Sequence, residues 1–126
     1  MIQVKSLQRV NPRDVEAPKK FYVQAVSAGK TDLDRLAYLI SNQSTVRKAD
    51  CYAVLEALLH NMMDELREGR IIELGNIGNF QIGVSSDAVE TEEEVTSGLV
   101  RKARISFRPA KALRDLLQTV DYKKVS

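Results

Sequence analysis

Length, composition and charge limit what this chain can be. It has 126 residues, of which 44% are hydrophobic and 29% charged, as is typical of one soluble globular domain. No apolar run approaches the ~20 residues that cross a bilayer, and the N-terminus lacks a signal-peptide core, so we expect a cytoplasmic protein without a membrane partner. Only 6% of residues are aromatic and Trp is absent, so we expect some apolar surface to be buried against a second copy.

The net charge of +2 is unevenly distributed along the chain. Residues 1–30 carry a net +4 and residues 105–126 a net +3, whereas residues 31–82 carry −3 and residues 83–104 carry −2. Basic residues therefore concentrate at the two ends and along one predicted strand. This distribution permits an anionic partner, although a charged stretch is more often a solvated face.

Residues 1–30 are predicted to form an extension before the main domain. Pro12 and Pro18 lie in turn-like stretches and argue against a helix there. The segment 21–26, Phe-Tyr-Val-Gln-Ala-Val, is rich in β-branched and aromatic residues, which predicts a strand within a sheet or at its edge. Residues 27–30, Ser-Ala-Gly-Lys, then end this strand.

Two helices are predicted next. Thr31 and Asp34 resemble a capping box, and apolar residues recur at helical spacing after them, which predicts a helix over residues 32–42. A second helix is predicted over residues 49–68, with Gly69 ending it. Its apolar residues cover a wider surface than packing on one neighbour requires, and this width predicts a dimer. They are Cys51, Val54, Leu55, Leu58, Leu59, Met62, Met63 and Leu66.

Few residues of this chain are candidates for chemistry. Cys51 is the only cysteine and His60 the only histidine, so neither an internal disulfide nor a zinc site can form. We interpret Cys51 as a small buried helix residue and His60 as structural or exposed. Met62 and Met63 could line a ligand groove, but Met fills core gaps far more often.

No cofactor, metal or small-molecule substrate is expected. The run Glu92-Glu93-Glu94 could suggest a metal site, but consecutive carboxylates point in different directions and are usually solvated. The sequence has no acid–base pair, nucleophile elbow or phosphate loop, so we do not expect an enzyme.

A glycine-rich hairpin is predicted at residues 69–82. Gly75, Asn76 and Gly78 tolerate positive φ and lie between two apolar runs, which predicts two strands joined by a tight turn. Residues 83–98 contain no Lys, Arg or Pro, and their composition suits a protruding, mobile loop or ribbon arm.

A return strand is predicted over residues 99–108, and Pro109 should end it. Alternation places Arg101 with apolar residues on one face and puts three cations on the other. These cations are Lys102, Arg104 and Arg108. With Pro109 at its first position, a third amphipathic helix is predicted as far as Val120. Lys111 and Arg114 lie near its start and oppose the helix dipole, a cost that an external anion could offset.

This order of elements resembles the bacterial histone-like HU and integration host factor family of DNA-bending proteins. Residues 74–80, LGNIGNF, are similar to the family's Leu-x-Gly-Phe-Gly-x-Phe hairpin. Residues 107–113, FRPAKAL, are similar to its Phe-Lys-Pro-Gly-Lys-x-Leu segment. The resemblance covers about residues 30–120, and residues 1–30 resemble the extension of longer HU-like proteins of the Bacteroides group.

The resemblance implies an α+β fold that forms an intertwined homodimer. It predicts two N-terminal helices, an antiparallel sheet with a protruding β arm at about residues 83–104, and a short C-terminal helix. An extension at residues 1–30 would precede an HU-like DNA-binding domain at residues 31–126. Family arms carry a proline that wedges between base pairs. Residues 83–98 have no proline, so this mechanism is not implied here.

The implied function is non-sequence-specific or weakly specific binding of double-stranded DNA in the bacterial nucleoid. A dimeric β saddle would contact phosphates, and any bending would come from wrapping. The alternative is an HU-fold dimeric scaffold or protein-interaction module, whose acidic arms repel nucleic acid or engage a basic partner. The DNA-binding candidates are Lys102, Arg104, Arg108, Lys111, Arg114 and Arg101.

Overall fold

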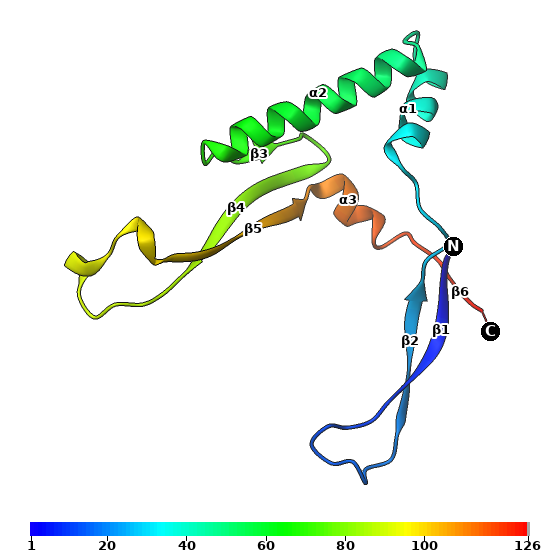
Figure 1. Cartoon of the computed structure of the whole chain (residues 1–126). Helices are drawn as coiled ribbons and strands as arrows, with labels where there is room; N and C mark the ends of the chain where they lie inside the picture. The colour runs from blue at the N-terminus through cyan, green and yellow to red at the C-terminus, as the bar shows by residue number, and fades with distance from the viewer. Residues whose placement is uncertain (126) are drawn as a thin grey trace. The chain divides into compact units, whose positions relative to one another are not determined.

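The computed structural model describes residues 1–125, which form two compact units (Figure 1). The extension unit combines Met1–Asp32 with the chain from Leu116 onward. The helix–ribbon unit is Leu33–Asp115. Together the described residues form a mixed α+β structure with three α-helices and two three-stranded sheets. The boundary predicted at residue 30 remains a prediction.

The extension unit is built on a sheet with the strand order β2-β1-β6. β1 (Ile2–Arg9) and β2 (Lys20–Val26) are antiparallel and aligned from Gln3 opposite Val26 to Arg9 opposite Lys20. β6 (Tyr122–Lys124) runs parallel to β1, with Ile2 opposite Tyr122. β2 confirms the strand predicted for residues 21–26. The sequence reasoning missed β1 and β6.

The connection between β1 and β2 is held by local side-chain hydrogen bonds. The Arg13 backbone amide donates to Asn11 Oδ1 at 2.9 Å, and the Glu16 amide donates to Asp14 Oδ1 at 3.1 Å. Such Asx turns satisfy backbone donors where the chain reverses. Pro12 and Pro18 lie in this connection and outside the strands, as predicted.

The helix–ribbon unit begins with two packed helices, α1 (Leu33–Asn42) and α2 (Lys48–Arg67). Both predicted helices are confirmed to within about one residue at each end. Gly69 follows α2 with a φ of +80°, the left-handed conformation predicted for it. Cys51 is buried, and His60 is exposed beside Asp64, with 3.5 Å between Nε2 and Oδ2.

A second sheet follows, in which β3 (Ile72–Glu73), β4 (Gly78–Ser86) and β5 (Val100–Pro109) are antiparallel in that order. The predicted hairpin is confirmed: the Leu74 amide donates to the Gly78 carbonyl, and the Ile77 amide to the Leu74 carbonyl, each at 2.9 Å. Gly75 and Gly78 have positive φ. Asn76 tolerates positive φ but does not adopt it here, because every residue with positive φ is a glycine in the described part of the chain.

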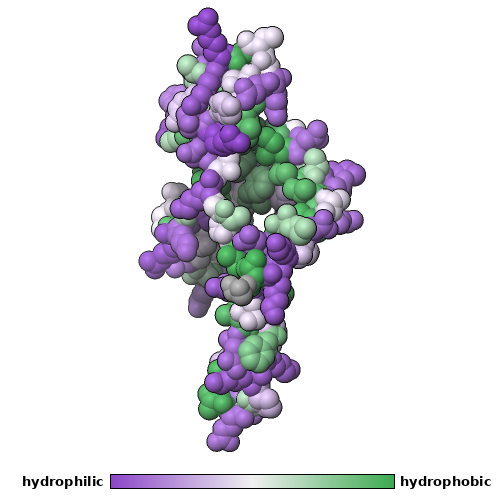
Figure 2. Space-filling view, turned by 90° about the vertical axis from the view of Figure 1, so that its right-hand side faces the viewer, coloured by the Kyte–Doolittle hydropathy of each residue, from purple (hydrophilic) through white to green (hydrophobic). Residues whose placement is uncertain are grey.

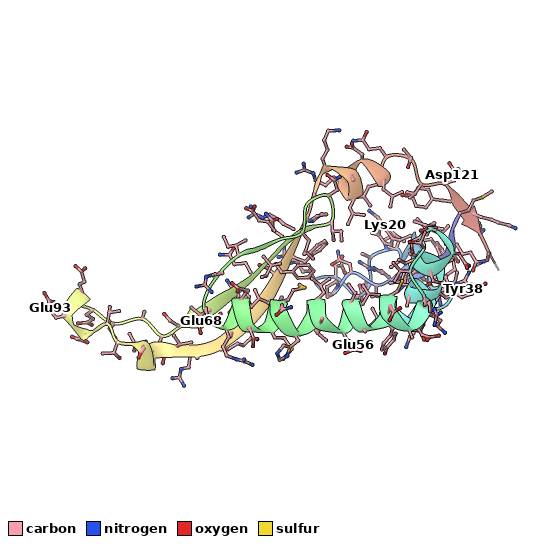
Figure 3. All side chains as sticks on the ribbon, turned by 90° about the horizontal axis from the view of Figure 1, so that it is seen from above. Lys20, Tyr38, Glu56, Glu68, Glu93 and Asp121 are labelled. Carbon is pink, nitrogen blue, oxygen red and sulfur yellow. The ribbon has the colours of Figure 1, made fainter. Side chains whose placement is uncertain are left out.

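Beyond the paired strands, the arm ends in two 3-10 turns. The Asp87 amide donates to the Leu99 carbonyl at 2.9 Å, and between them lie η1 (Glu92–Glu94) and η2 (Ser97–Leu99). We call η1 the acidic turn; Glu93 projects from the end of the arm (Figure 3). The arm predicted for residues 83–104 is therefore a strand pair that continues into a loop.

The third helix, α3 (Lys111–Leu116), is shorter than predicted. The prediction that this helix continues to Val120 is wrong. The Thr119 amide and hydroxyl both donate to the Leu116 carbonyl, at 3.0 and 2.9 Å, and the chain then enters β6. Pro109 is the last residue of β5 and not the first residue of the helix. Arg114 lies in the last turn of this short helix, so its predicted opposition to the dipole is also wrong.

The chain buries little apolar surface by itself. Among the described residues, the buried core consists of Ala37, Cys51 and Leu66. The accessible surface is 11,077 Å², whereas a folded monomer of this size exposes about 6,700 Å². On α2, Val54 is 64% exposed and Leu59 54% exposed. Figure 2 shows apolar side chains, in green, open at the surface in patches between hydrophilic ones.

Candidate nucleic-acid interface

The paired strands β4 and β5 form a ribbon with two unlike faces. On one face, Phe80 lies opposite Phe107, with ring centroids 4.8 Å apart, and Ile82 lies opposite Ile105. On the other face each cation of β5 lies opposite a small or uncharged residue of β4. The cross-strand pairs are Asn79 with Arg108, Gly83 with Arg104, and Ser85 with Lys102. The predicted grouping of Lys102, Arg104 and Arg108 on one face is confirmed by this register.

We call the second face the basic ribbon face. From Lys102 to Arg108 it extends about 20 Å, at ~3.4 Å per residue. β4 and β5 contain no acidic residue. Glu73 of β3 lies opposite Asn79 and so shares this face at one end. Within residues 1–125, neither Lys102 nor Arg108 forms an ion pair, so their charges are available to an external anion.

Arg104 is positioned by two residues of the neighbouring strand. Its Nη1 donates to Ser85 Oγ at 3.3 Å. Its guanidinium also lies across Gly83: a Cβ added at that glycine would lie 3.0 Å from Nη2 of Arg104. Gly83 therefore leaves the space that the Arg104 side chain occupies. The sequence reasoning missed this role, since it depends on the register of the two strands.

Arg101 lies at an interruption in the regular alternation of β5. The register shifts between Ser85, opposite Lys102, and Ser86, opposite Val100, so Arg101 is the extra residue of a β-bulge. Its Nε donates to Asp87 Oδ2 at 2.6 Å. Regular alternation therefore does not assign Arg101 to a face, and its charge is paired within the arm.

The two α3 candidates differ in their pairing. Lys111 Nζ lies 2.6 Å from Asp115 Oδ2, an exposed pair one helical turn apart. Arg114 is exposed and makes no ion pair in the part of the chain that the structure describes. Of the six predicted residues, the structure groups Lys102, Arg104 and Arg108 on one surface and leaves Arg114 accessible on α3.

The acidic turn lies at the opposite end of the arm from α3. Its three carboxylates are exposed, and Glu94 accepts a hydrogen bond from Thr91 Oγ1 at 3.1 Å. In residues 1–125, no group of three or more His, Cys, Asp or Glu side chains is arranged to hold a metal ion. None of the described helices has both the length and the apolar character needed to span a membrane.

Comparison with known proteins gives a family and a related fold. The model of the HU-HIG family, described as an HU domain fused to a wHTH, Ig or glycine-rich motif, matches residues 1–124. One similar solved structure comes from Bacteroides vulgatus ATCC 8482 and is described as a "putative bacterial DNA binding protein". Its TM-score is 0.64 at 14% identity, over 98% of this chain and 48% of that chain. No curated protein matches.

These comparisons support the resemblance drawn from the hairpin and the Phe-Arg-Pro segment. The structural likeness, at 14% identity, concerns the fold, and this chain spans about half the length of that protein. The family match includes the extension as well as the helices, ribbon and arm. With 124 of its 126 residues matched, the chain belongs to the HU-HIG family.

Proposed function

We propose that this protein binds double-stranded DNA through its phosphates, with little readout of base sequence. The observation that carries the proposal is the basic ribbon face, where three cations lie in one row on strands that contain no acid. Cations in such a row neutralise backbone charge and release counterions, which favours binding to any duplex. Membership of an HU family and likeness to a protein described as DNA-binding support the same function.

The residues between the cations also suit phosphate contacts. Asn79, Gln81 and Ser85 share the basic ribbon face by register, and their side chains can donate hydrogen bonds to phosphate oxygens. Contacts of this kind fix a protein on the duplex without reading its sequence. Because the arm lacks a wedge proline, we propose that any bending comes from wrapping on the ribbon, in an architectural role in the bacterial nucleoid.

We further propose that the DNA-binding unit is a homodimer. The accessible surface of 11,077 Å² exceeds the monomer expectation by about 4,400 Å² for each chain. Obligate homodimer interfaces bury about 2,000–5,000 Å² in total, or about 1,000–2,500 Å² of each copy, so this chain exposes enough surface for such an interface. The exposed apolar residues of α2, with Val54 and Leu59 among them, are the surface we assign to the partner copy. Two copies would bring two basic ribbon faces to one duplex.

A salt titration with linear duplex DNA tests the proposal. The affinity of the wild-type protein should fall as salt rises, with a log–log slope of about 0.9 for each phosphate contact. The triple variant Lys102→Gln, Arg104→Gln, Arg108→Gln should reduce that slope by about 2.7 per protomer and weaken binding to every duplex sequence equally. Lys111→Gln, which removes one charge, should reduce the slope by less than about 0.9, because the charge of Lys111 is already paired with Asp115.

One observation favours a second function, that of a dimeric scaffold for a basic protein partner. The helix–ribbon unit carries eleven Lys and Arg against thirteen Asp and Glu, a net charge of −2, and the acidic turn is exposed at the end of its arm. Failure of the wild-type protein to bind duplex DNA at low ionic strength would decide for the scaffold. The arm would then be its binding surface.

A further inference from the structure

The sheet of the extension unit also has two unlike faces. Strand alternation and the observed register place apolar residues on one face, where Phe21 is 70% exposed and Val23 71% exposed. The opposite face, which we call the basic sheet face, carries four cations from three strands. They are Lys5, Arg9, Lys20 and Lys123. Lys124 is the one cation of these strands on the apolar face.

The net charge of the extension unit is strongly positive, whereas the net charge of the helix–ribbon unit is negative. It carries eight Lys and Arg against four Asp and Glu, a net charge of +4. None of its acids lies in β1, β2 or β6. The cations of the basic sheet face therefore have no carboxylate in the sheet to pair with, and none of them forms an ion pair within residues 1–125.

Two of these cations are held side by side. Arg9 lies directly opposite Lys20 in the β1–β2 register, and like charges in opposite positions destabilise a sheet. The guanidinium of Arg9 lies 5.6 Å from the centre of the Tyr22 ring, which holds it over the face. An anion bound beside Arg9 and Lys20 would offset the repulsion between their charges. The same holds for any two adjacent cations.

The same end of the sheet is hollowed. A cavity of about 510 Å³ is lined by side chains of this face and by the β1–β2 connection. Arg9, Lys20 and Tyr22 line it together with Val10, Asn11, Pro12, Ala17 and Pro18. From this end, the cations continue along β1 to Lys5 over about 14 Å, at ~3.4 Å per residue. A duplex carries one charge per ~1.7 Å of axis, so this length faces several phosphates.

We propose that the basic sheet face is a second phosphate-binding surface for duplex DNA, separate from the basic ribbon face. The inference rests on the proposed function and extends the contact to the extension unit. Duplex DNA is the favoured occupant because single strands are held by bases stacked on successive aromatic residues. This face has one aromatic residue, Tyr22, which Arg9 already covers, while Phe21 lies on the opposite face.

The test compares two variants that remove equal charge from the same unit. Lys5→Gln, Arg9→Gln, Lys20→Gln removes three cations from the basic sheet face. The control, Arg13→Gln, Lys30→Gln, Lys124→Gln, removes three from the connecting loop, from the segment after β2 and from the apolar face. Fluorescence anisotropy of a labelled duplex of about 30 base pairs at several salt concentrations gives the slope for each full-length protein.

The face variant should lower the salt slope by up to about 2.7 per protomer, and the control by less than 0.9, the value of about one phosphate contact. The same difference should persist when Lys102, Arg104 and Arg108 are also replaced by Gln. Equal slopes in wild type and face variant, or equal losses in both variants, would overturn the inference. The proposed ribbon contact would survive that result.

A single-stranded oligonucleotide of the same length identifies the occupant. If the face variant lowers the salt slope for the single-stranded oligonucleotide and leaves the slope for the duplex unchanged, the assignment to duplex DNA is overturned. A second variant, Lys5→Gln, Lys123→Gln, keeps the Arg9–Tyr22 contact and should still lower the duplex slope by up to about 1.8 per protomer. Circular dichroism should show wild-type folding for this variant, because both side chains are exposed at the surface.

Discussion

Gly78 is the residue at which the hairpin tolerates a side chain least. Its φ is +148°, and a Cβ there would lie 2.3 Å from the Arg108 carbonyl oxygen and 2.7 Å from Cε1 of Phe107. Because the Arg108 carbonyl oxygen belongs to the backbone, β4 and β5 would have to separate to relieve this overlap. Gly78→Ala should therefore lower the free energy of unfolding by about 3 kcal/mol or more, measured by urea denaturation.

Gly98→Ala is the control for that measurement. Its nearest neighbour would be Thr96 Oγ1 at 3.5 Å, an ordinary contact, and its φ is not positive. The stability change should stay within about 0.5 kcal/mol. Similar losses at both glycines would contradict the close packing described for Gly78.

Arg101 and Arg104 should contribute differently to DNA binding although they are three residues apart. Arg101 is paired with Asp87 at 2.6 Å, whereas Arg104 makes a neutral hydrogen bond to Ser85 and keeps its charge unpaired. Arg104→Gln should reduce the salt slope by about 0.9, and Arg101→Gln by clearly less. The two single variants can be compared in one salt titration, and a larger effect at Arg101 would refute the assignment of the interface.

Sequence patterns predicted the properties of residues that depend on one strand and missed those that depend on the pairing of two strands. Alternation placed Lys102, Arg104 and Arg108 on one face because that grouping needs only a regular strand. The bulge at Arg101 is a property of pairing with β4, and no feature of the β5 sequence marks it. The space left by Gly83 for Arg104 depends on the same register.

The acidic turn, with its three exposed carboxylates, should oppose DNA binding. If the arm lies along bound DNA, Glu92, Glu93 and Glu94 repel its phosphates, and replacing all three by Gln should tighten binding. The gain should be larger at low salt, since charges further apart than ~10 Å at 0.1 M are screened. Anisotropy titrations at two salt concentrations measure this. Unchanged affinity at both would place the turn away from the duplex.

Element prediction succeeded for α1, α2 and the hairpin, where strong local signals agree with the fold. Gly69 ends α2, and glycines form the turn before β4, so the residue types themselves mark the end of the helix and the position of the turn. β1 was missed because its sequence, IQVKSLQR, mixes polar residues into both faces. β6 has three residues and forms by pairing with β1. Because the chain leaves the helix to reach this strand, α3 ends at Leu116 although the helical pattern of the sequence continues to Val120.

For the whole molecule, stability should depend on protein concentration. If α2 packs on a second copy, Leu59→Glu places a charge in that interface and should yield an unfolded or monomeric protein. Ala57→Glu is the control, because Ala57 lies on the side of α2 away from the apolar residues by helical spacing. Analytical ultracentrifugation and melting at several concentrations measure the effect. A folded wild-type monomer at micromolar concentration would refute the dimer.

The family resemblance predicted the order of elements, but it could not show how little the chain buries. The wide apolar surface of α2 was visible in the sequence, and the structure leaves Val54 and Leu59 exposed there. A sequence pattern cannot assign such residues to a core or to a partner, because both environments select the same side chains.

The pairing of β6 with β1 affects how the protein can form during synthesis. The extension unit is discontinuous: its first two strands precede the helix–ribbon unit in the chain and its third follows it. As the chain leaves the ribosome from its N-terminus, β1 and β2 can pair early, but the edge of β1 that receives β6 stays open until the helix–ribbon unit and β6 itself have been made. During translation that edge is a temporary site for pairing with another chain, and β6 closes it last.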